Sequence, residues 1–170
     1  MKEHLKKIKR YQVLFLILAI AVMVTIFILS SQDADRSSDT SSTLTRIAIK
    51  LMYRDYDAAS PERQREMWST ASFIVRKLAH FSIYTALGLC VSGAAGKRRL
   101  FSPKSAGVVI FGLIYAVSDE FHQHFVPGRS CEFRDMMIDT GGVLTGMLIS
   151  FVLMGIAGFI AGRRRHGRNK

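Results

Sequence analysis

Two adjacent acids, Asp119 and Glu120, stand just after an apolar run that ends at Val117. Two histidines, a glutamine and an arginine follow before Ser130, so groups that carry or transfer protons occur where hydrocarbon should begin or end. Ionisable groups at membrane depth are costly, and each therefore needs a partner or a task. Because neighbouring carboxylates repel each other when both are ionised, one of them can hold a proton and take part in general acid–base chemistry.

Polar side chains recur at helical spacing on three apolar runs, which puts those of each run on one helix face. The three faces consist of Lys77, His80 and Tyr84; of Tyr115, Asp119 and Gln123, with Glu120 beside them; and of Asp135, Asp139 and Gly142. At a rise of about 1.5 Å per residue, all of them lie near the same end of their helices. The sequence predicts three helices that point polar faces at one outward-opening cavity, with Arg129 above it.

The same side chains fit three different functions. We expect ligand binding by Lys77, His80, Tyr84, Glu120, Gln123, Arg129, Asp135 and Asp139. The cationic groups suit phosphate or carboxylate, whereas the acids suit amines or sugar hydroxyls. If the protein is instead an enzyme, the candidate acid–base groups are His80, Asp119 and Glu120. A structural interpretation is also open, because Lys77 and Arg76 can pair with the two adjacent acids and only hold the helices together.

A divalent cation is a further candidate ligand, with donor atoms from His80, Asp119, Glu120 and Asp135. Their spacing follows no metal-binding motif, so the sequence leaves both metal and cofactor open. Ser130 and Cys131 lack the flanking residues that accompany nucleophiles. No reaction is therefore assigned from the sequence.

Composition favours a membrane protein. Hydrophobic residues make up 49% of the 170 residues, yet the net charge is +11, from 24 Lys and Arg against 13 Asp and Glu. The positive charge flanks long apolar segments, as it does at the cytoplasmic ends of transmembrane helices. A nucleic-acid-binding protein is disfavoured because the basic residues form no stripe on a soluble domain.

Apolar runs at 11–29, 73–95, 105–117 and 135–161 predict four transmembrane helices. The third run is short, so its helix must carry Asp119, Glu120 and Gln123 to the rim of the bilayer. Lys and Arg number five before residue 11, four in 96–104 and five after 162. An even number of spans puts these segments on one side, which predicts a multi-pass protein of the cell membrane with both termini in the cytoplasm.

The predicted fold is one all-α membrane domain, residues 11–161, between basic cytoplasmic tails at 1–10 and 162–170. An extracytoplasmic connection at 31–72 joins the first two spans. Within it, the Ser-, Asp- and Thr-rich segment 30–43 predicts a loop, and 44–53 has the spacing of a short amphipathic helix. Ser60 and Pro61 predict the start of a helix that continues to Gly93 or Gly96.

In this order the motifs resemble those of the VanZ-like bacterial membrane proteins. The resemblance rests on Ser30-Ser31-Gln32, on Lys77-x-x-His80-x-x-x-Tyr84-x-x-x-Gly88, on Asp119-Glu120-x-x-Gln123-x-x-x-Pro127-Gly128-Arg129 and on Asp135-x-x-x-Asp139-Thr140-x-Gly142. Many relatives have Glu followed by another residue in place of Asp119-Glu120, and Asn in place of Asp139. The resemblance implies a small polytopic cell-envelope protein, and the family's founding member is associated with teicoplanin resistance.

The first hypothesis is a cell-envelope membrane protein that binds an anionic or glycosylated ligand in an outward-facing polar cavity. Its expected partners are membrane lipids, with a lipid-linked wall precursor or a lipoglycopeptide as the specific ligand, and not nucleic acid. The first alternative is a membrane-embedded acid–base enzyme acting on a lipid or phosphate ester. The second is an ion-paired structural scaffold without a ligand.

Overall fold

A computed structural model of the chain describes residues 9–96, 100–129 and 131–167 and, apart from 34–40 and 161–167, their side chains. Within these ranges the fold is all-α, as predicted. The helices are α1 (Arg10–Ser30), α2 (Ala34–Met52), α3 (Pro61–Ala95), α4 (Pro103–Gln123) and α5 (Phe133–Gly167), with a 3₁₀ turn, η1 (Tyr56–Ala58), before α3. The Ser60 side chain caps α3 by accepting a hydrogen bond from the Arg63 N–H, which confirms the predicted helix start.

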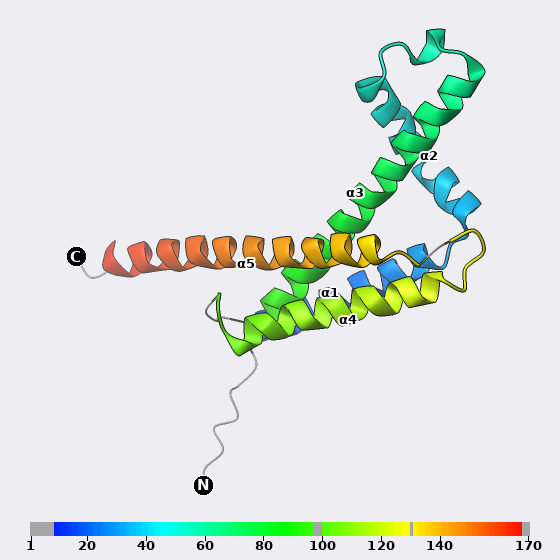
Figure 1. Cartoon of the computed structure of the whole chain (residues 1–170). Coiled ribbons are helices and arrows are strands. Elements are labelled where there is room, and N and C mark those ends of the chain that lie inside the picture. The colour runs from blue at the N-terminus through cyan, green and yellow to red at the C-terminus, as the bar shows by residue number, and fades with distance from the viewer. Residues whose placement is uncertain (1–8, 97–99, 130, 168–170) are drawn as a thin grey trace.

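Helix α3 occupies the centre of the arrangement. It packs against α1, α2, α4 and α5, and α4 packs in turn against α5 and α1 (Figure 1). The first half of α3 projects from the bundle together with α2 and η1 (Figure 1). Because α3 contacts every other α-helix, side chains from all of these helices can meet around it.

Three helices of the described chain are long and apolar enough to cross a membrane: α1, α3 and the Phe133–Ile160 part of α5. Large apolar side chains of α1, such as Leu14, Ile17 and Ile28, are more than half exposed, as expected for a surface that faces lipid. Helix α4 is not in this set, because its last two turns include Asp119, Glu120 and Gln123. The chain is a multi-pass membrane protein, but the predicted count of four spans is not confirmed.

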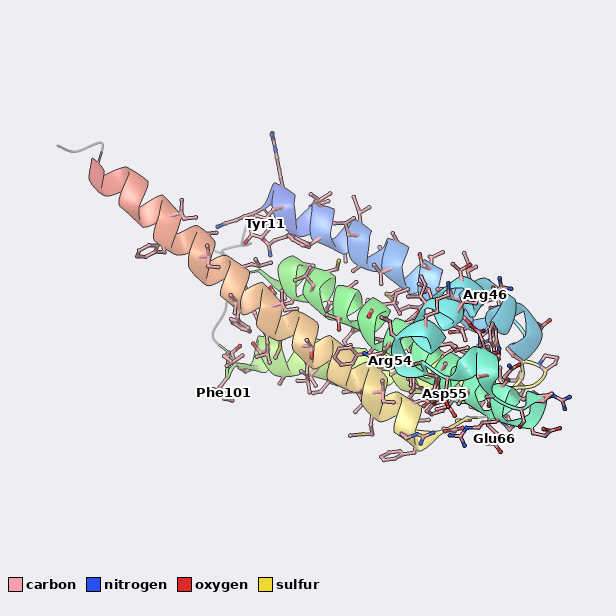
Figure 2. All side chains as sticks on the ribbon, turned by 90° about the horizontal axis from the view of Figure 1, so that it is seen from above. Tyr11, Arg46, Arg54, Asp55, Glu66 and Phe101 are labelled. Atoms are coloured by element: carbon pink, nitrogen blue, oxygen red, sulfur yellow. The ribbon has the colours of Figure 1, made fainter. Side chains whose placement is uncertain are left out.

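Charged side chains of both signs gather at one end of the molecule (Figure 2). Arg46, Arg54, Asp55 and Glu66 lie at the end formed by α2, η1 and the start of α3, whereas Tyr11 and Phe101 lie at the opposite end. The predicted connection at 31–72 thus forms a polar extension of the bundle.

Glycines allow α3 and α5 to approach closely. A Cβ atom added to Gly88 would lie 2.2 Å from the Val143 carbonyl oxygen, and one added to Gly146 would lie 2.0 Å from that of Thr85. At Gly142 the nearest atom would be the Phe81 carbonyl oxygen at 2.6 Å. The spacing of Gly142 and Gly146 predicts such a contact, and the structure confirms it.

The loop predicted for 30–43 is wrong over most of its length. Helix α2 begins at Ala34, so the amphipathic helix expected at 44–53 is only the second half of a longer one. Thr45 and Ile49 are buried, and α2 packs along α3. Tertiary packing stabilises helices whose residues have weak intrinsic propensity, which a reading of composition alone does not detect.

Candidate functional site

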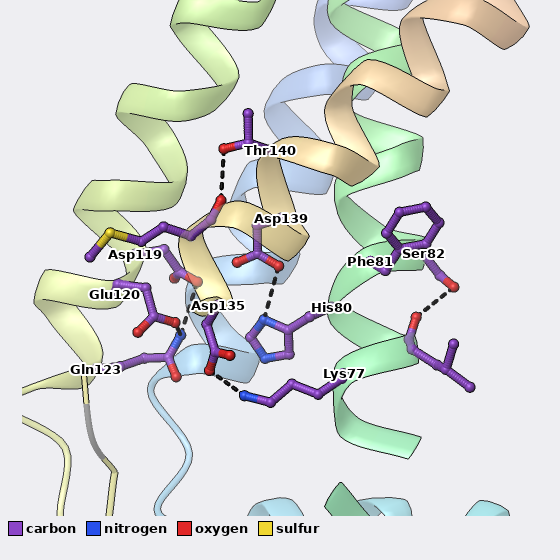
Figure 3. A network of polar contacts seen from close by, with 12 residues as sticks. Lys77, His80, Phe81, Ser82, Asp119, Glu120, Gln123, Asp135, Asp139 and Thr140 are labelled. Atoms are coloured by element: carbon purple, nitrogen blue, oxygen red, sulfur yellow. Dashed lines mark hydrogen bonds and ion pairs between the residues drawn. The ribbon is translucent and has the colours of Figure 1, made fainter. Parts of the chain in front are cut away.

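Three helices bring their polar faces together at one end of the bundle, as the spacing predicts (Figure 3). We call this set the polar cluster; its members are Lys77, His80 and Tyr84 from α3, Asp119, Glu120 and Gln123 from α4, and Asp135 and Asp139 from α5. Tyr84, Glu120 and Asp139 have no exposed surface, and Asp119 is 5% exposed. Burial of this many ionisable groups requires that each be matched by donors, by opposite charge or by a ligand.

Lys77 forms an ion pair with Asp135 across the α3–α5 contact (Figure 3). Its ammonium group also lies 5.0 Å from the centre of the Phe73 ring. The predicted pairing of Lys77 with Asp119 or Glu120 is therefore wrong. Within the described residues, Arg76 forms no ion pair with either of these acids. The reason is geometric: α5, not α4, lies against this part of α3.

The two adjacent acids of α4 are held by neutral donors. Gln123 Nε2 donates to Asp119 Oδ2 at 3.1 Å and to Glu120 Oε1 at 3.4 Å, while the Glu132 N–H donates to Glu120 Oε2 at 3.0 Å. Arg129 Nη1 in turn donates to Gln123 Oε1 at 3.0 Å. Gln123 thus links the acids to the guanidinium, and Glu120 has a donor on each oxygen.

The turn that precedes Arg129 sets its position. Gly128 has φ +74°, a left-handed conformation that glycine adopts readily, which confirms the predicted turn at Pro127-Gly128. Burial lowers the pKa of the Arg129 guanidinium, and repulsion by Arg76 lowers it further. Arg129 Nε is buried and has no hydrogen-bond partner in the described part of the chain.

Asp139 and His80 meet at the centre of the cluster. His80 Nδ1 lies 3.6 Å from Asp139 Oδ1, beyond hydrogen-bond distance. Within the described residues both Asp139 oxygens lack a hydrogen bond, as does the buried hydroxyl of Tyr84. Donor atoms of His80, Asp119 and Asp139 all lie within 4.8 Å of one another. The centre of the cluster is thus the part whose polar atoms are least satisfied.

A partly open cavity of about 180 Å³ adjoins the cluster, and we call it the α1–α3 cavity. Its apolar lining comes from α1, α2 and α3: Ile26, Leu29, Leu44, Val75, Ala79 and Ile83. Its polar lining combines two guanidinium groups, an imidazole and smaller groups: Arg76, Arg129, His80, Ser30, Gln32 and Ser41. The cavity therefore has a cationic part and an apolar part.

Sequence reasoning missed the role of Arg76 and of Ser30 and Gln32 in forming this cavity. Arg76 and His80 are four residues apart and so share a helix face, which is the signal that points to Arg76. Ser30 and Gln32 belong to a motif at the end of the first span, but nothing local indicates what it faces. Ligand binding by the predicted residues stays a prediction.

Other predicted residues lie outside the cluster. His122 stacks on Phe27, with ring centres 4.7 Å apart, and its Nε2 lies 3.0 Å from Ser31 Oγ. The exposed Cys131 has no contact with the cluster among the interactions described, and Ser130 lies outside the described residues. His122 thus contacts α1 and the residue that follows it, and among the described contacts it makes none with the polar cluster.

A model of the VanZ/LLP1 family matches residues 15–154, which include every member of the polar cluster. No curated protein and no solved structure matches the chain. Because the match extends over most of the sequence, this chain belongs to the VanZ/LLP1 family, in agreement with the resemblance seen in its motifs.

Proposed function

We propose that this VanZ/LLP1 family membrane protein binds the anionic headgroup of a membrane lipid in the α1–α3 cavity. The observation that carries the proposal is the presence of Arg76 and Arg129 in one small cavity. Two like charges this close repel each other, and an anion between them would relieve the repulsion. Guanidinium groups also match phosphate oxygens geometrically, which favours a phosphate-bearing headgroup.

The size and lining of the cavity support a headgroup rather than a whole lipid. At about 180 Å³ it is smaller than the pockets of roughly 300–1,000 Å³ that enclose drug-sized ligands. Its apolar side includes Leu29 at the end of α1, which is exposed, so the cavity adjoins the outer apolar surface of that helix. A phosphate can thus enter the cationic part while the acyl chains stay against the outside of the bundle.

The proposal includes an orientation. Helix α4 is taken as a fourth crossing, with both termini in the cytoplasm and the cavity opening on the wall side. The distribution of Lys and Arg supports this orientation, as does the burial of Asp119, Glu120 and Gln123 against other helices and not against lipid. On the wall side, the candidate ligands are an anionic phospholipid and a lipid-linked wall precursor.

A titration tests headgroup binding. Purified protein in a neutral detergent is titrated with short-chain phosphatidylglycerol and, separately, with phosphatidylcholine. Arg76→Met should weaken binding of the anionic lipid by about 10- to 150-fold, the equivalent of one charge-assisted hydrogen bond. Arg134→Met removes a positive charge from an exposed side chain outside the cavity and should leave the affinity unchanged. Equal affinity of wild type and Arg76→Met for phosphatidylglycerol would refute the proposal.

Teicoplanin susceptibility of a deletion strain tests the proposal in living cells. If the headgroup belongs to a lipid-linked wall precursor, deletion of the gene should lower the teicoplanin concentration that inhibits growth, and Arg76→Met should fail to restore it. Unchanged susceptibility would restrict the ligand to an ordinary membrane phospholipid.

Hydrolysis of a phosphate ester is a second candidate function. His80 lines the cavity while Asp139 lies behind its ring, and a carboxylate placed so can orient an imidazole for proton transfer. The test is phosphate release from short-chain phosphatidic acid. This function predicts that His80→Gln abolishes release and leaves binding intact; no release by the wild type excludes it for this substrate.

A further inference from the structure

We propose that His80, Asp119 and Asp139 form a binding site for a divalent transition-metal cation, with Zn²⁺ as the best match. The three residues come from α3, α4 and α5, and their donor atoms lie within 4.8 Å of one another. A metal at this point would therefore tie together the three helices that make up the cluster. The site goes beyond lipid binding, and its test does not depend on a lipid.

The charge balance at the centre of the cluster calls for a cation. Asp139 is fully buried, and neither of its oxygens has a hydrogen-bond partner within the described residues. Asp119 is also buried and accepts only from Gln123 Nε2 among the described contacts. An unpaired carboxylate in a protein interior costs several kcal/mol, roughly, even after relaxation. Two of them side by side are stable only when a bound proton or a cation offsets their charge, and a metal cation can offset both at once.

Within the described residues, neither Lys77 nor Arg129 forms an ion pair with Asp119 or Asp139. Lys77 pairs with Asp135, and the contact that Arg129 makes with the cluster is its hydrogen bond to the Gln123 amide. Glu120 needs no further partner, because one oxygen accepts from the Glu132 N–H and the other from Gln123. The imidazole of His80 is thus the nearest group that can share charge with Asp139, and a bound cation would satisfy both.

The donor set selects the metal. Imidazole nitrogen and carboxylate oxygen are ligands of Zn²⁺, whereas Ca²⁺ takes six to eight oxygens and Mg²⁺ prefers an octahedral oxygen shell. Tetrahedral bonds of about 2.0–2.2 Å place ligand atoms about 3.4 Å apart. His80 Nδ1 and Asp139 Oδ1 are already 3.6 Å apart. Small rotations of Asp119 would complete three protein ligands, which leaves a fourth position for water or a headgroup oxygen.

The structure changes the set of metal ligands that the sequence suggests. The sequence points to His80, Asp119, Glu120 and Asp135, but the last two are engaged by hydrogen bonds and by Lys77. Asp139 takes their place. The buried hydroxyl of Tyr84 belongs to the same cluster and has no hydrogen-bond partner within the described residues, so it can donate to a carboxylate oxygen that does not bind the metal. Metal-binding carboxylates are commonly oriented by such donors.

Metal analysis of the purified chain tests the site. Protein treated with EDTA and then titrated with ZnCl₂ should bind about one Zn²⁺ per chain, in the absence of added lipid and with a large excess of Mg²⁺ present. Asp139→Asn should weaken Zn²⁺ binding at least about 100-fold, because loss of an outer-shell partner alone costs 10- to 100-fold. Glu66→Gln, a matched carboxylate-to-amide change at an exposed residue of α3 outside the cluster, should keep the wild-type affinity.

Folding is monitored separately by gel filtration and thermal unfolding. If Asp139→Asn does not fold, His80→Gln replaces it as the test variant, since His80 is partly exposed. Failure of the wild type to bind Zn²⁺ saturably overturns the inference, and so does equal Zn²⁺ affinity of Glu66→Gln and a folded ligand variant. Zn²⁺ binding without selectivity for phosphatidylglycerol would support the metal site and count against lipid binding, so the two proposals fail separately.

Discussion

The closeness of α3 and α5 predicts that Gly146→Ala disrupts both stability and the polar cluster. The new Cβ would lie 2.0 Å from the Thr85 carbonyl oxygen and 2.6 Å from the Leu89 nitrogen, both backbone atoms that cannot rotate away. Ordinary contact starts at 3.4 Å, so the helices must separate by about 1.4 Å (3.4 Å less 2.0 Å). Overpacking of this kind costs about 1–3 kcal/mol.

Gly155→Ala is the matched control, because nothing lies within 4 Å of a Cβ at this position of the same helix. It should be neutral or stabilise by up to about 1 kcal/mol through higher helix propensity. Unfolding of both variants in mixed detergent micelles with increasing dodecyl sulfate gives the comparison, and the expected difference is roughly 1–4 kcal/mol.

A functional readout accompanies this measurement. His80 lies on α3 and Asp139 on α5, so separation of the helices should also weaken Zn²⁺ binding in Gly146→Ala and not in Gly155→Ala. Equal stability of the two variants would show that α3 and α5 do not pack as the structure has them.

Three other predictions concern orientation and individual contacts. Cys131 is exposed, and a maleimide that does not cross the membrane should label it in intact spheroplasts, while the buried Cys90 stays unlabelled. Labelling of Cys131 only after permeabilisation would show that the protein has the opposite orientation. Lys77→Met and Asp135→Asn should each destabilise by about 1–3 kcal/mol, less than the 3–5 of a fully buried pair because both side chains are partly exposed. The double variant should be more stable than additivity predicts, and strict additivity would mean that the ion pair contributes nothing. Tyr115→Phe removes a 2.7 Å hydrogen bond to a carbonyl of α1 and should cost about 0.5–1.5 kcal/mol; unchanged unfolding would argue against the contact between α1 and α4.

Local signals in the sequence predict the central helices and the composition of the cluster. Ser60-Pro61 and Gly96 enclose α3, and positions 77, 80 and 84 share its face because helical periodicity is a local property. Which of these helix faces meet depends on contacts between residues far apart in the sequence. Lys77 meets Asp135 because of how α5 crosses α3, and that crossing depends on where Gly88 and Gly146 allow backbones to touch.

The α1–α3 cavity was not predictable for a related reason. It forms where α2 packs beside the end of α1 and the middle of α3, but the segment 34–43 has the composition of a loop. Serine and threonine inside a helix compete with its backbone hydrogen bonds, so a run of them argues against a helix unless packing compensates. Hydropathy likewise does not decide whether α4 crosses the membrane. Asp119, Glu120 and Gln123 lower the mean hydropathy of this helix although they are buried inside the bundle.

Lipid binding in the cavity is the proposal on which most of the functional interpretation depends. Mass spectrometry of lipids retained by the gently purified protein tests it most directly, with an Arg76→Met/Arg129→Met double variant purified in parallel. The wild type should retain about one anionic, phosphate-bearing lipid per chain, and the double variant should lose it while its zwitterionic lipids stay the same. Retention of the same anionic lipid by both proteins, or of zwitterionic lipids alone by the wild type, would contradict the proposal.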